Sequence, residues 1–292
     1  MKALTLLIKS NIYISLAAVL LTISTQVQIE MDPQWHPYLF LIFFATLFEY
    51  NLHRLITVLT NRDALRSDKH NWVNSRRNGF YLLMIFSVLG FIIAVLQAKL
   101  KVLLTLAPIA GLTLFYSTPI SRSTKGILRL RQIPYLKIFL ISFVWSTVTV
   151  FLPVTYSEKS FNKFHLLTVI VERFLFVMAI TIPFDIRDME ADRQAGLKTI
   201  PLKIGVQKSI GLSLRILILF FVITVIHYCI TDQWILVNAF TISFLATIIF
   251  LRNEKIRSMP LYYYGILDGT LLLQGFLVIV SYYINLIFSY KC

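Results

Sequence analysis

Long runs of apolar residues, separated by polar segments, dominate the chain. Each run has roughly the 17–25 residues that an α-helix needs to cross the ~30 Å hydrocarbon core of a bilayer. Nine such segments can be drawn: 11–28, 37–60, 80–98, 101–117, 136–156, 164–185, 209–230, 233–251 and 261–288. The pattern predicts an all-α, polytopic membrane protein with nine transmembrane helices, formed as a single integral membrane domain over residues 1–292.

The polar segments between these runs alternate in charge. If the N-terminus is placed in the cytoplasm, the segments on that side carry several times as many lysine and arginine residues as those on the other side. Cytoplasmic loops of membrane proteins are enriched in these residues. We therefore expect an N-in, C-out, multi-pass protein of the inner (cell) membrane. Its longest polar loops, 61–79, 118–135 and 186–208, would be cytoplasmic, and long loops on one face often carry function.

The composition agrees with a membrane location, because 57% of the residues are hydrophobic, 14% are charged and the mean hydropathy is +0.74. A net charge of +14 would suggest nucleic-acid binding in a soluble protein. In a membrane protein, basic loops set the topology and contact anionic lipids. We therefore expect membrane lipid, and no nucleic acid, among the partners.

Three aspartates follow the sixth apolar run at a regular spacing. Asp185, Asp188 and Asp192 are spaced i, i+3, i+7, so a helix places all three carboxylates on one face. Carboxylates this close repel one another unless a cation lies between them. Mg²⁺ prefers one or two carboxylates together with water and phosphate oxygens. The spacing therefore indicates a candidate Mg²⁺ site for a diphosphate.

A second interpretation of this segment is equally open on spacing alone. The carboxylates would then belong to a solvated helix end and pair with basic residues of the same segment, Arg187, Arg193 and Lys198. Under both interpretations the helix ends near Gly196 and Pro201, because these residues favour helix termination.

The segment also resembles a known family motif. The pattern Asp185-x-x-Asp188-x-x-x-Asp192-x-x-x-Gly196-x-x-Thr199-x-Pro201-x-x-x-Gly205 is similar to the second aspartate-rich motif of the UbiA superfamily of intramembrane prenyltransferases. The core pair of that motif falls on Asp188 and Asp192. The run Tyr116-Ser117-Thr118-Pro119, the nine spans and the N-in orientation resemble the family as well, so the resemblance covers essentially the whole chain.

The resemblance implies a helical bundle with a central cavity that opens to the cytoplasm and to lipid. It implies an enzyme that transfers a prenyl group from a polyprenyl diphosphate to an aromatic or other lipophilic acceptor, assisted by Mg²⁺. Asp188 and Asp192, helped by Asp185, would be the catalytic and metal-binding residues. Three basic residues would bind the diphosphate: Arg122, Lys125 and Lys198.

The family's first motif, Asn-Asp-x-x-Asp, is not reproduced. Asn51 matches its asparagine, but Leu52 and Leu55 stand at the two aspartate positions and cannot bind a metal. We expect Asn51 and Arg54 to bind the diphosphate, because an arginine can replace a metal by binding anionic oxygen directly. The alternative is that Glu49 forms a buried structural pair with Arg54 or His53.

Two functions of different classes remain open. One is a prenyltransferase with a non-standard first motif, which the second motif favours. The other is a catalytically inactive or repurposed UbiA-like protein that binds lipid or scaffolds a partner, which the leucines favour. A further pair, Glu172 and Arg173, lies inside the sixth run. Adjacent residues point about 100° apart on a helix, so we expect each to pair with other helices rather than with the other.

Overall fold

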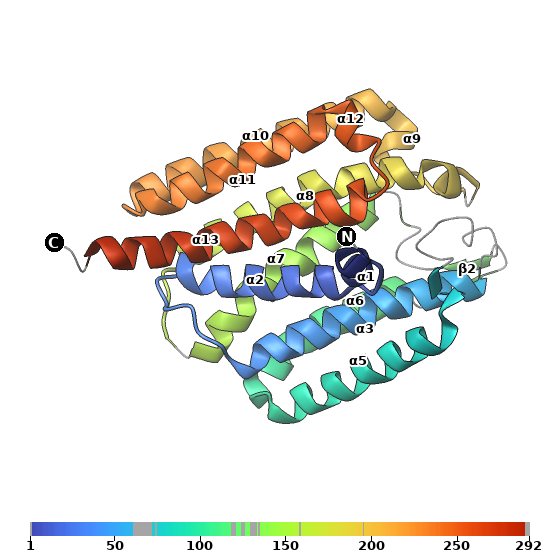
Figure 1. The fold of residues 1–292 in the computed structure, drawn as a ribbon, viewed down its shortest axis with the longest axis horizontal. Coiled ribbons are helices and arrows are strands. Elements are labelled where there is room, and N and C mark those ends of the chain that lie inside the picture. Colours follow the sequence, from blue (N-terminus) through green and yellow to red (C-terminus); the bar gives the residue numbers. More distant parts are fainter. Residues whose placement is uncertain are drawn as a thin grey trace.

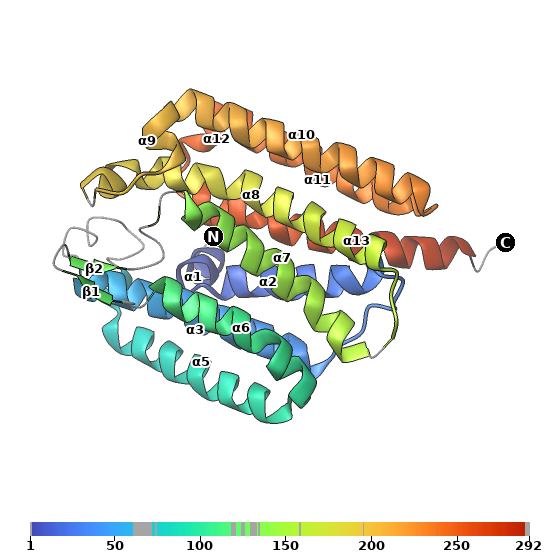
Figure 2. The same ribbon diagram turned by 180° about the vertical axis from the view of Figure 1, so that it is seen from behind.

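The computed structural model of the chain describes residues 2–60, 72–73, 75–117, 121–123, 126–128, 133, 135–157, 159–194 and 196–289. Long helices run side by side in one bundle (Figures 1 and 2). The first part contains α1 (Lys2–Lys9), α2 (Ile12–Gln28), α3 (Pro37–Thr60), α5 (Arg77–Gln97), α6 (Leu100–Ser117) and α7 (Leu136–Ser157). The second contains α8 (Lys163–Gln194), α9 (Ile200–Ile204), α10 (Val206–Ile230), α11 (Trp234–Arg252), α12 (Glu254–Arg257), a π-helix η3 (Tyr262–Leu267) and α13 (Asp268–Ser289). Between α6 and α7, β1 (Ser121–Ser123) pairs antiparallel with β2 (Gly126–Leu128).

Each of the nine apolar segments predicted from the sequence lies in a helix. Seven of the described helices are long and apolar enough to cross a membrane, or eight if the bent pair α1–α2 is one span. The apolar part of α6 is shorter, Leu100–Thr113. The helical membrane fold is therefore confirmed, with seven or eight helices, rather than nine, that meet the length and hydropathy of a span.

Helix α2 lies at the centre of the bundle and contributes to both apolar clusters of the core (Figure 1). One cluster joins α2 to α8, α10, α11 and α13, and the other joins it to α3, α5, α6 and α7. Hydroxyl groups inside α2 donate to carbonyls one turn back, as Thr22 Oγ1 does to Ala18 O at 2.8 Å. Such bonds reduce the cost of burying a polar side chain.

Helix α8 has 32 residues, which corresponds to about 48 Å at 1.5 Å per residue. This exceeds the ~30 Å hydrocarbon core, so one end of α8 projects beyond it. The helix contains Pro183, which lacks the N–H that would bond to Ala179 O. Ser213 of α10 donates its hydroxyl to that carbonyl instead. The neighbouring helix thus satisfies the carbonyl that the proline leaves, and α8 continues to Gln194.

The end of α8 follows the local rules that the sequence suggested. Gly196 has a φ of 67° and donates its N–H to Arg193 O at 3.0 Å. The N–H of Leu197 donates to Asp192 O at 2.9 Å. These two bonds form a Schellman motif, in which a glycine in the left-handed region ends the helix. The predicted helix over the three aspartates and its end near Gly196 are confirmed.

The N-terminal bend was not predicted. Helices α1 and α2 meet at 80°, and Asn11 between them has a φ of 65°. Asparagine is one of the few residues that adopt this left-handed conformation readily. The sequence pattern predicted a helix from residue 11 but gave no sign of the separate helix α1.

Candidate active site

A lysine of α7 holds two of the three aspartates of α8. Lys137 Nζ lies 2.8 Å from Asp185 Oδ1 and 3.4 Å from Asp188 Oδ2. The side chain of Asp185 is 2% exposed, whereas that of Asp188 is 30% exposed. A buried carboxylate needs a cationic partner to remain ionised, so Lys137 stabilises Asp185 at this depth. Asp192, which is also buried, lies one turn beyond Asp188.

Arg187 provides the second cation of the site. It binds Asp188 through two hydrogen bonds, from Nε to Oδ1 at 2.7 Å and from Nη2 to Oδ2 at 2.9 Å. Its guanidinium also lies over three rings, 5.1 Å from Phe184, 5.5 Å from Tyr263 and 4.7 Å from Tyr264. A planar guanidinium suits both the carboxylate and the ring faces. The two tyrosines come from the π-helix η3, and π-helical turns are frequent at functional sites.

Two cations and two carboxylates therefore form one network at this end of α8, which we call the aspartate network. The charges of Lys137 and Arg187 offset those of Asp185 and Asp188. The pairing of Asp188 with Arg187 agrees with one part of the second interpretation, in which the aspartates pair with basic residues of the same segment.

The first-motif residues Asn51 and Arg54 bind the junction between α1 and α2. Asn51 donates to Ser10 O at 3.0 Å and accepts from Asn11 Nδ2 at 2.9 Å. Arg54 donates to Lys9 O and, at 2.7 Å, to Asn11 Oδ1. Both side chains are buried. Their hydrogen bonds therefore fix the 80° bend, and neither goes to an aspartate of α8.

Arg54 is nevertheless close to the aspartate network. Tyr264 of η3 lies within electrostatic reach of Arg54, Arg187, Asp188 and Asp268. The charges of the α3 arginine and of Asp188 in α8 thus both act on Tyr264.

The other basic residues expected at the diphosphate are exposed or have side chains outside the described residues. Lys198 is exposed, and its carbonyl accepts the N–H of Tyr135 at 3.3 Å. Arg122 lies in β1, but its side chain is outside the described residues, as is the whole of Lys125. The 116–119 motif begins at the end of α6 and continues outside the described residues.

Sequence reasoning missed the role of two residues. Lys137 lies 51 positions before Asp188 and belongs to no motif, so only the packing of α7 against α8 brings it to the site. Arg187 was considered only as a partner in a solvated turn, and its contacts with η3 join segments far apart in the sequence. No local signal could have identified either contact.

The aspartates suit Mg²⁺ in their chemistry, because this cation takes hard oxygen ligands. Among the described residues, no three or more aspartate, glutamate, histidine or cysteine side chains gather closely enough to hold a metal by themselves. Mg²⁺ needs only one or two carboxylates where phosphate oxygens and waters complete its shell. Asp188 and Asp192 fit that requirement, with Asp188 shared with Arg187.

A cavity of about 500 Å³ lies at the other end of the bundle. Its lining includes Val27, Glu30, Asp232, Trp234, Tyr282 and Asn285. It does not include the aspartate network, so the candidate site is defined here by its charged side chains and not by this cavity.

Long apolar helices, with carboxylates and basic side chains gathered at one end of the bundle, are typical of an integral membrane protein. The family model for the UbiA prenyltransferase family matches residues 73–260, more than half of the chain. The chain therefore belongs to the UbiA prenyltransferase family. Among curated proteins, no sequence matches it significantly.

Solved structures share the fold over almost the whole chain. A UbiA homolog from Archaeoglobus fulgidus bound to DMAPP and Mg²⁺ has a TM-score of 0.60 at 13% identity, covering 91% of this chain and 96% of that chain. An apo UbiA homolog from Aeropyrum pernix K1 has a TM-score of 0.59 at 14% identity, covering 95% and 98%. A structure of digeranylgeranylglyceryl phosphate synthase has a TM-score of 0.53 at 15% identity, covering 94% and 96%. At these identities the likeness shows the fold alone.

Proposed function

We propose that this protein is a membrane-embedded prenyltransferase, which moves a prenyl group from a polyprenyl diphosphate to an aromatic or other lipophilic acceptor with the help of Mg²⁺. The observation that carries the proposal is the aspartate network at the end of α8, in a chain of the UbiA prenyltransferase family. Archaeoglobus fulgidus relatives of the same fold have been solved with DMAPP or GPP and Mg²⁺.

The proposal includes a topology. The bent pair α1–α2 and the shorter α6 would join the seven long helices to give nine spans, N-in and C-out. The excess of lysine and arginine in one set of loops supports this orientation. The aspartate end of α8 would then face the cytoplasm, where a charged diphosphate arrives from water while its prenyl chain lies among apolar helices.

In this proposal, Asp188 and Asp192, helped by Asp185, hold the metal. A bound Mg²⁺ would stabilise negative charge on the departing diphosphate. Lys137 and Arg187 lie 2.7–3.4 Å from carboxylate oxygens, so they would neutralise the oxygens of a diphosphate bound beside these carboxylates. Three loop residues would add further positive charge: Arg122, Lys125 and Lys198.

The chemistry then follows from charge separation. The allylic C–O bond breaks, and its electron pair leaves with the diphosphate oxygen. A nucleophilic atom of the acceptor, an aromatic carbon or an alcohol oxygen, forms the new bond to the prenyl carbon, and the acceptor gives up a proton. Phe184, Tyr263 and Tyr264 already surround the Arg187 cation, and rings of this kind also stabilise an allylic cation.

Arg54 and Asn51 are proposed to act at the diphosphate in different ways. Both hydrogen bonds of the Arg54 guanidinium go to neutral oxygens, of Lys9 and Asn11, and these bonds do not cancel its charge. That charge would attract the diphosphate at the position where Leu52 removes a metal ligand. Asn51 would keep the α1–α2 junction in place beside it.

A second candidate function is that of a lipid-binding or scaffold protein without transferase activity. The observation that favours it is the neutralisation of Asp185 and Asp188 by Lys137 and Arg187. Carboxylates that already have cationic partners bind a metal less readily, since the metal must compete with those partners.

Binding of geranyl diphosphate to the purified protein in detergent, with and without Mg²⁺, tests the proposed site. We expect Mg²⁺-dependent binding, weakened about tenfold or more, or 1.4 kcal/mol, by Asp188→Asn combined with Asp192→Asn. Glu190→Gln is the matched control, because Glu190 is exposed on the same helix and pairs with Arg193. Binding that depends neither on Mg²⁺ nor on the two aspartates would overturn the metal assignment.

A further inference from the structure

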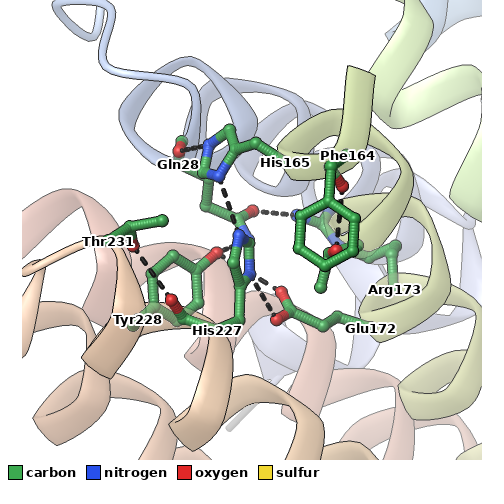
Figure 3. A network of polar contacts seen from close by, with 9 residues as sticks. Gln28, Phe164, His165, Glu172, Arg173, His227, Tyr228 and Thr231 are labelled. Carbon is green, nitrogen blue, oxygen red and sulfur yellow. Dashed lines mark hydrogen bonds and ion pairs between the residues drawn. The ribbon is translucent and has the colours of Figure 1, made fainter. Parts of the chain in front are cut away.

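A second polar network lies at the end of the bundle away from the aspartates (Figure 3). It joins the C-terminal ends of α2 and α10 to the beginning of α8. The side chains of His227 and Glu172 are each 2% exposed, whereas His165 is half-buried. About 20 Å of helix, at 1.5 Å per residue, separates Glu172 from Asp185. This network is therefore distinct from the proposed prenyl diphosphate site.

Three contacts of equal length link these residues into a chain. His165 Nε2 lies 2.7 Å from Gln28 O, His165 Nδ1 lies 2.7 Å from His227 Nε2, and His227 Nδ1 lies 2.7 Å from Glu172 Oε1. At this distance two nitrogen or oxygen atoms repel each other unless a hydrogen lies between them. Each contact therefore contains one proton. Because the Gln28 carbonyl can only accept, His165 Nε2 carries the first of the three.

The proton count has a direct consequence. Two neutral imidazoles and an ionised carboxylate supply two protons, but three contacts require three. The three contacts therefore hold one proton more than two histidines and one glutamate carry in neutral water. That proton can lie on Glu172, on His227 or on His165 with all three contacts intact. Moving it between these positions needs only transfers across contacts of 2.7 Å.

The inner end of the chain is fully hydrogen-bonded. Arg173 donates Nη2 to Gln28 Oε1 at 2.6 Å and Nη1 to Leu21 O at 3.0 Å. Gln28 Nε2 donates to the Tyr228 hydroxyl at 2.7 Å, and that hydroxyl donates to Glu172 Oε2 at 3.3 Å. The adjacent guanidinium stabilises an ionised carboxylate and opposes any second additional proton.

The outer end reaches the surface at His165. Glu30, which follows α2, acts on His165 electrostatically. Among the described residues, two further charged or titratable groups act electrostatically on these side chains. They are Arg173 of α8 and Tyr228 of α10. The negative charge of Glu30 therefore acts on the His165 end of this row of contacts, and the positive charge of Arg173 acts on the Glu172 end.

We propose that His165, His227 and Glu172 form a proton-binding relay, which takes up one proton from solution through half-buried His165 and uses it to hold the ends of α2, α8 and α10 together. Loss of this proton would leave two lone pairs facing each other across one of the 2.7 Å contacts. The ligand is a proton, and the site is independent of the diphosphate chemistry at the other end of the bundle.

The test variant is Glu172→Gln. A glutamine amide can donate its N–H to His227 Nδ1, so both imidazoles remain neutral and each contact keeps a hydrogen without the additional proton. The variant is therefore expected to fold. Thermal unfolding of the full-length protein in detergent is measured from about pH 7.5, one unit above the ordinary pKa of histidine, to about pH 9.

In that range the unfolded chain has neutral histidines and an ionised Glu172, so it binds one proton fewer than the folded chain. Stability must then fall as the pH rises. We expect the Tm of the wild type to decrease with rising pH and that of Glu172→Gln to decrease clearly less. Glu190→Gln is the matched control, since Glu190 is exposed near the other end of α8 and pairs with Arg193 at 2.9 Å, and it should keep the wild-type slope.

Equal slopes in the wild type and Glu172→Gln would overturn the proposal. A metal at the facing nitrogens of His165 and His227 would also overturn it. In that case added Zn²⁺ would raise the Tm of the wild type, EDTA would reverse the increase, and His165→Gln would not respond to Zn²⁺. If Glu172→Gln does not fold, ¹⁵N-histidine NMR of the wild type at about pH 8 decides. Two of the five imidazoles should show hydrogen-bonded nitrogens that share protons, and five freely titrating imidazoles would refute the relay.

Discussion

Replacing Lys137 by methionine tests whether this residue is the counter-ion of the aspartates. Methionine keeps much of the apolar stem but removes the charge 2.8 Å from buried Asp185. Removing one partner of a buried ion pair costs about 3–5 kcal/mol. Because Lys137 and Asp188 are 21% and 30% exposed, water compensates part of that loss, and we expect about 1–3 kcal/mol. Thermal unfolding in detergent should show this as a lower Tm.

The same variant separates metal binding from diphosphate binding. Without Lys137 the aspartate network carries net negative charge, so it should bind a divalent cation more tightly and a diphosphate less tightly. A unit charge at about 4 Å contributes about 4 kcal/mol at an effective dielectric constant of 20. Solvent exposure and salt reduce this, and we expect about a tenfold change in each Kd, in opposite directions.

Calorimetric titration of Mg²⁺ alone, and of geranyl diphosphate at saturating Mg²⁺, measures both affinities. Lys137→Arg is the control, because it keeps the charge and should stay close to the wild type for both ligands. If Lys137→Met leaves both affinities unchanged, the placement of Lys137 in the ligand site is refuted.

Two predictions concern the packing that positions the site. Gly275→Ala would place a Cβ 2.8 Å from the backbone carbonyl carbon of Leu20. Helices α13 and α2 must then move apart, and the Tm should fall by several degrees. Gly211→Ala is the control, because its Cβ meets nothing within 4 Å and its Tm should match or exceed that of the wild type. Ser213→Ala removes the donor to the Ala179 carbonyl and should cost about 1–3 kcal/mol in thermal unfolding; an unchanged Tm would show that this hydrogen bond does not stabilise α8.

Local rules predicted most of the helical architecture. The apolar runs are long enough to identify the long helices, and Gly196 marks the end of α8 through its left-handed backbone. The 80° bend between α1 and α2 was not predictable. It depends on Asn11 in a left-handed conformation and on Asn51, 40 positions away, whose hydrogen bonds stabilise it.

The candidate site was only partly predictable for the same physical reason. The aspartates could be found because they follow one another at helical spacing, whereas the cation that neutralises Asp185 comes from another helix. The expectation that Glu172 and Arg173 pair with other helices is confirmed, since they bind His227 and Gln28 respectively. Which partners they choose depends on the packing of α8 against α10 and α2, and the sequence pattern does not show it.

The most direct test of the central claim is prenyl transfer itself. Purified protein is incubated with radiolabelled geranyl diphosphate, Mg²⁺ and a panel of aromatic acids and lipid-soluble alcohols, and prenylated products are separated from the diphosphate. We predict product with at least one acceptor for the wild type and for Glu190→Gln, and about a hundredfold less when Asp188→Asn and Asp192→Asn are combined. Mg²⁺-dependent binding of geranyl diphosphate by the wild type without product from any acceptor would contradict the transferase and support the lipid-binding scaffold.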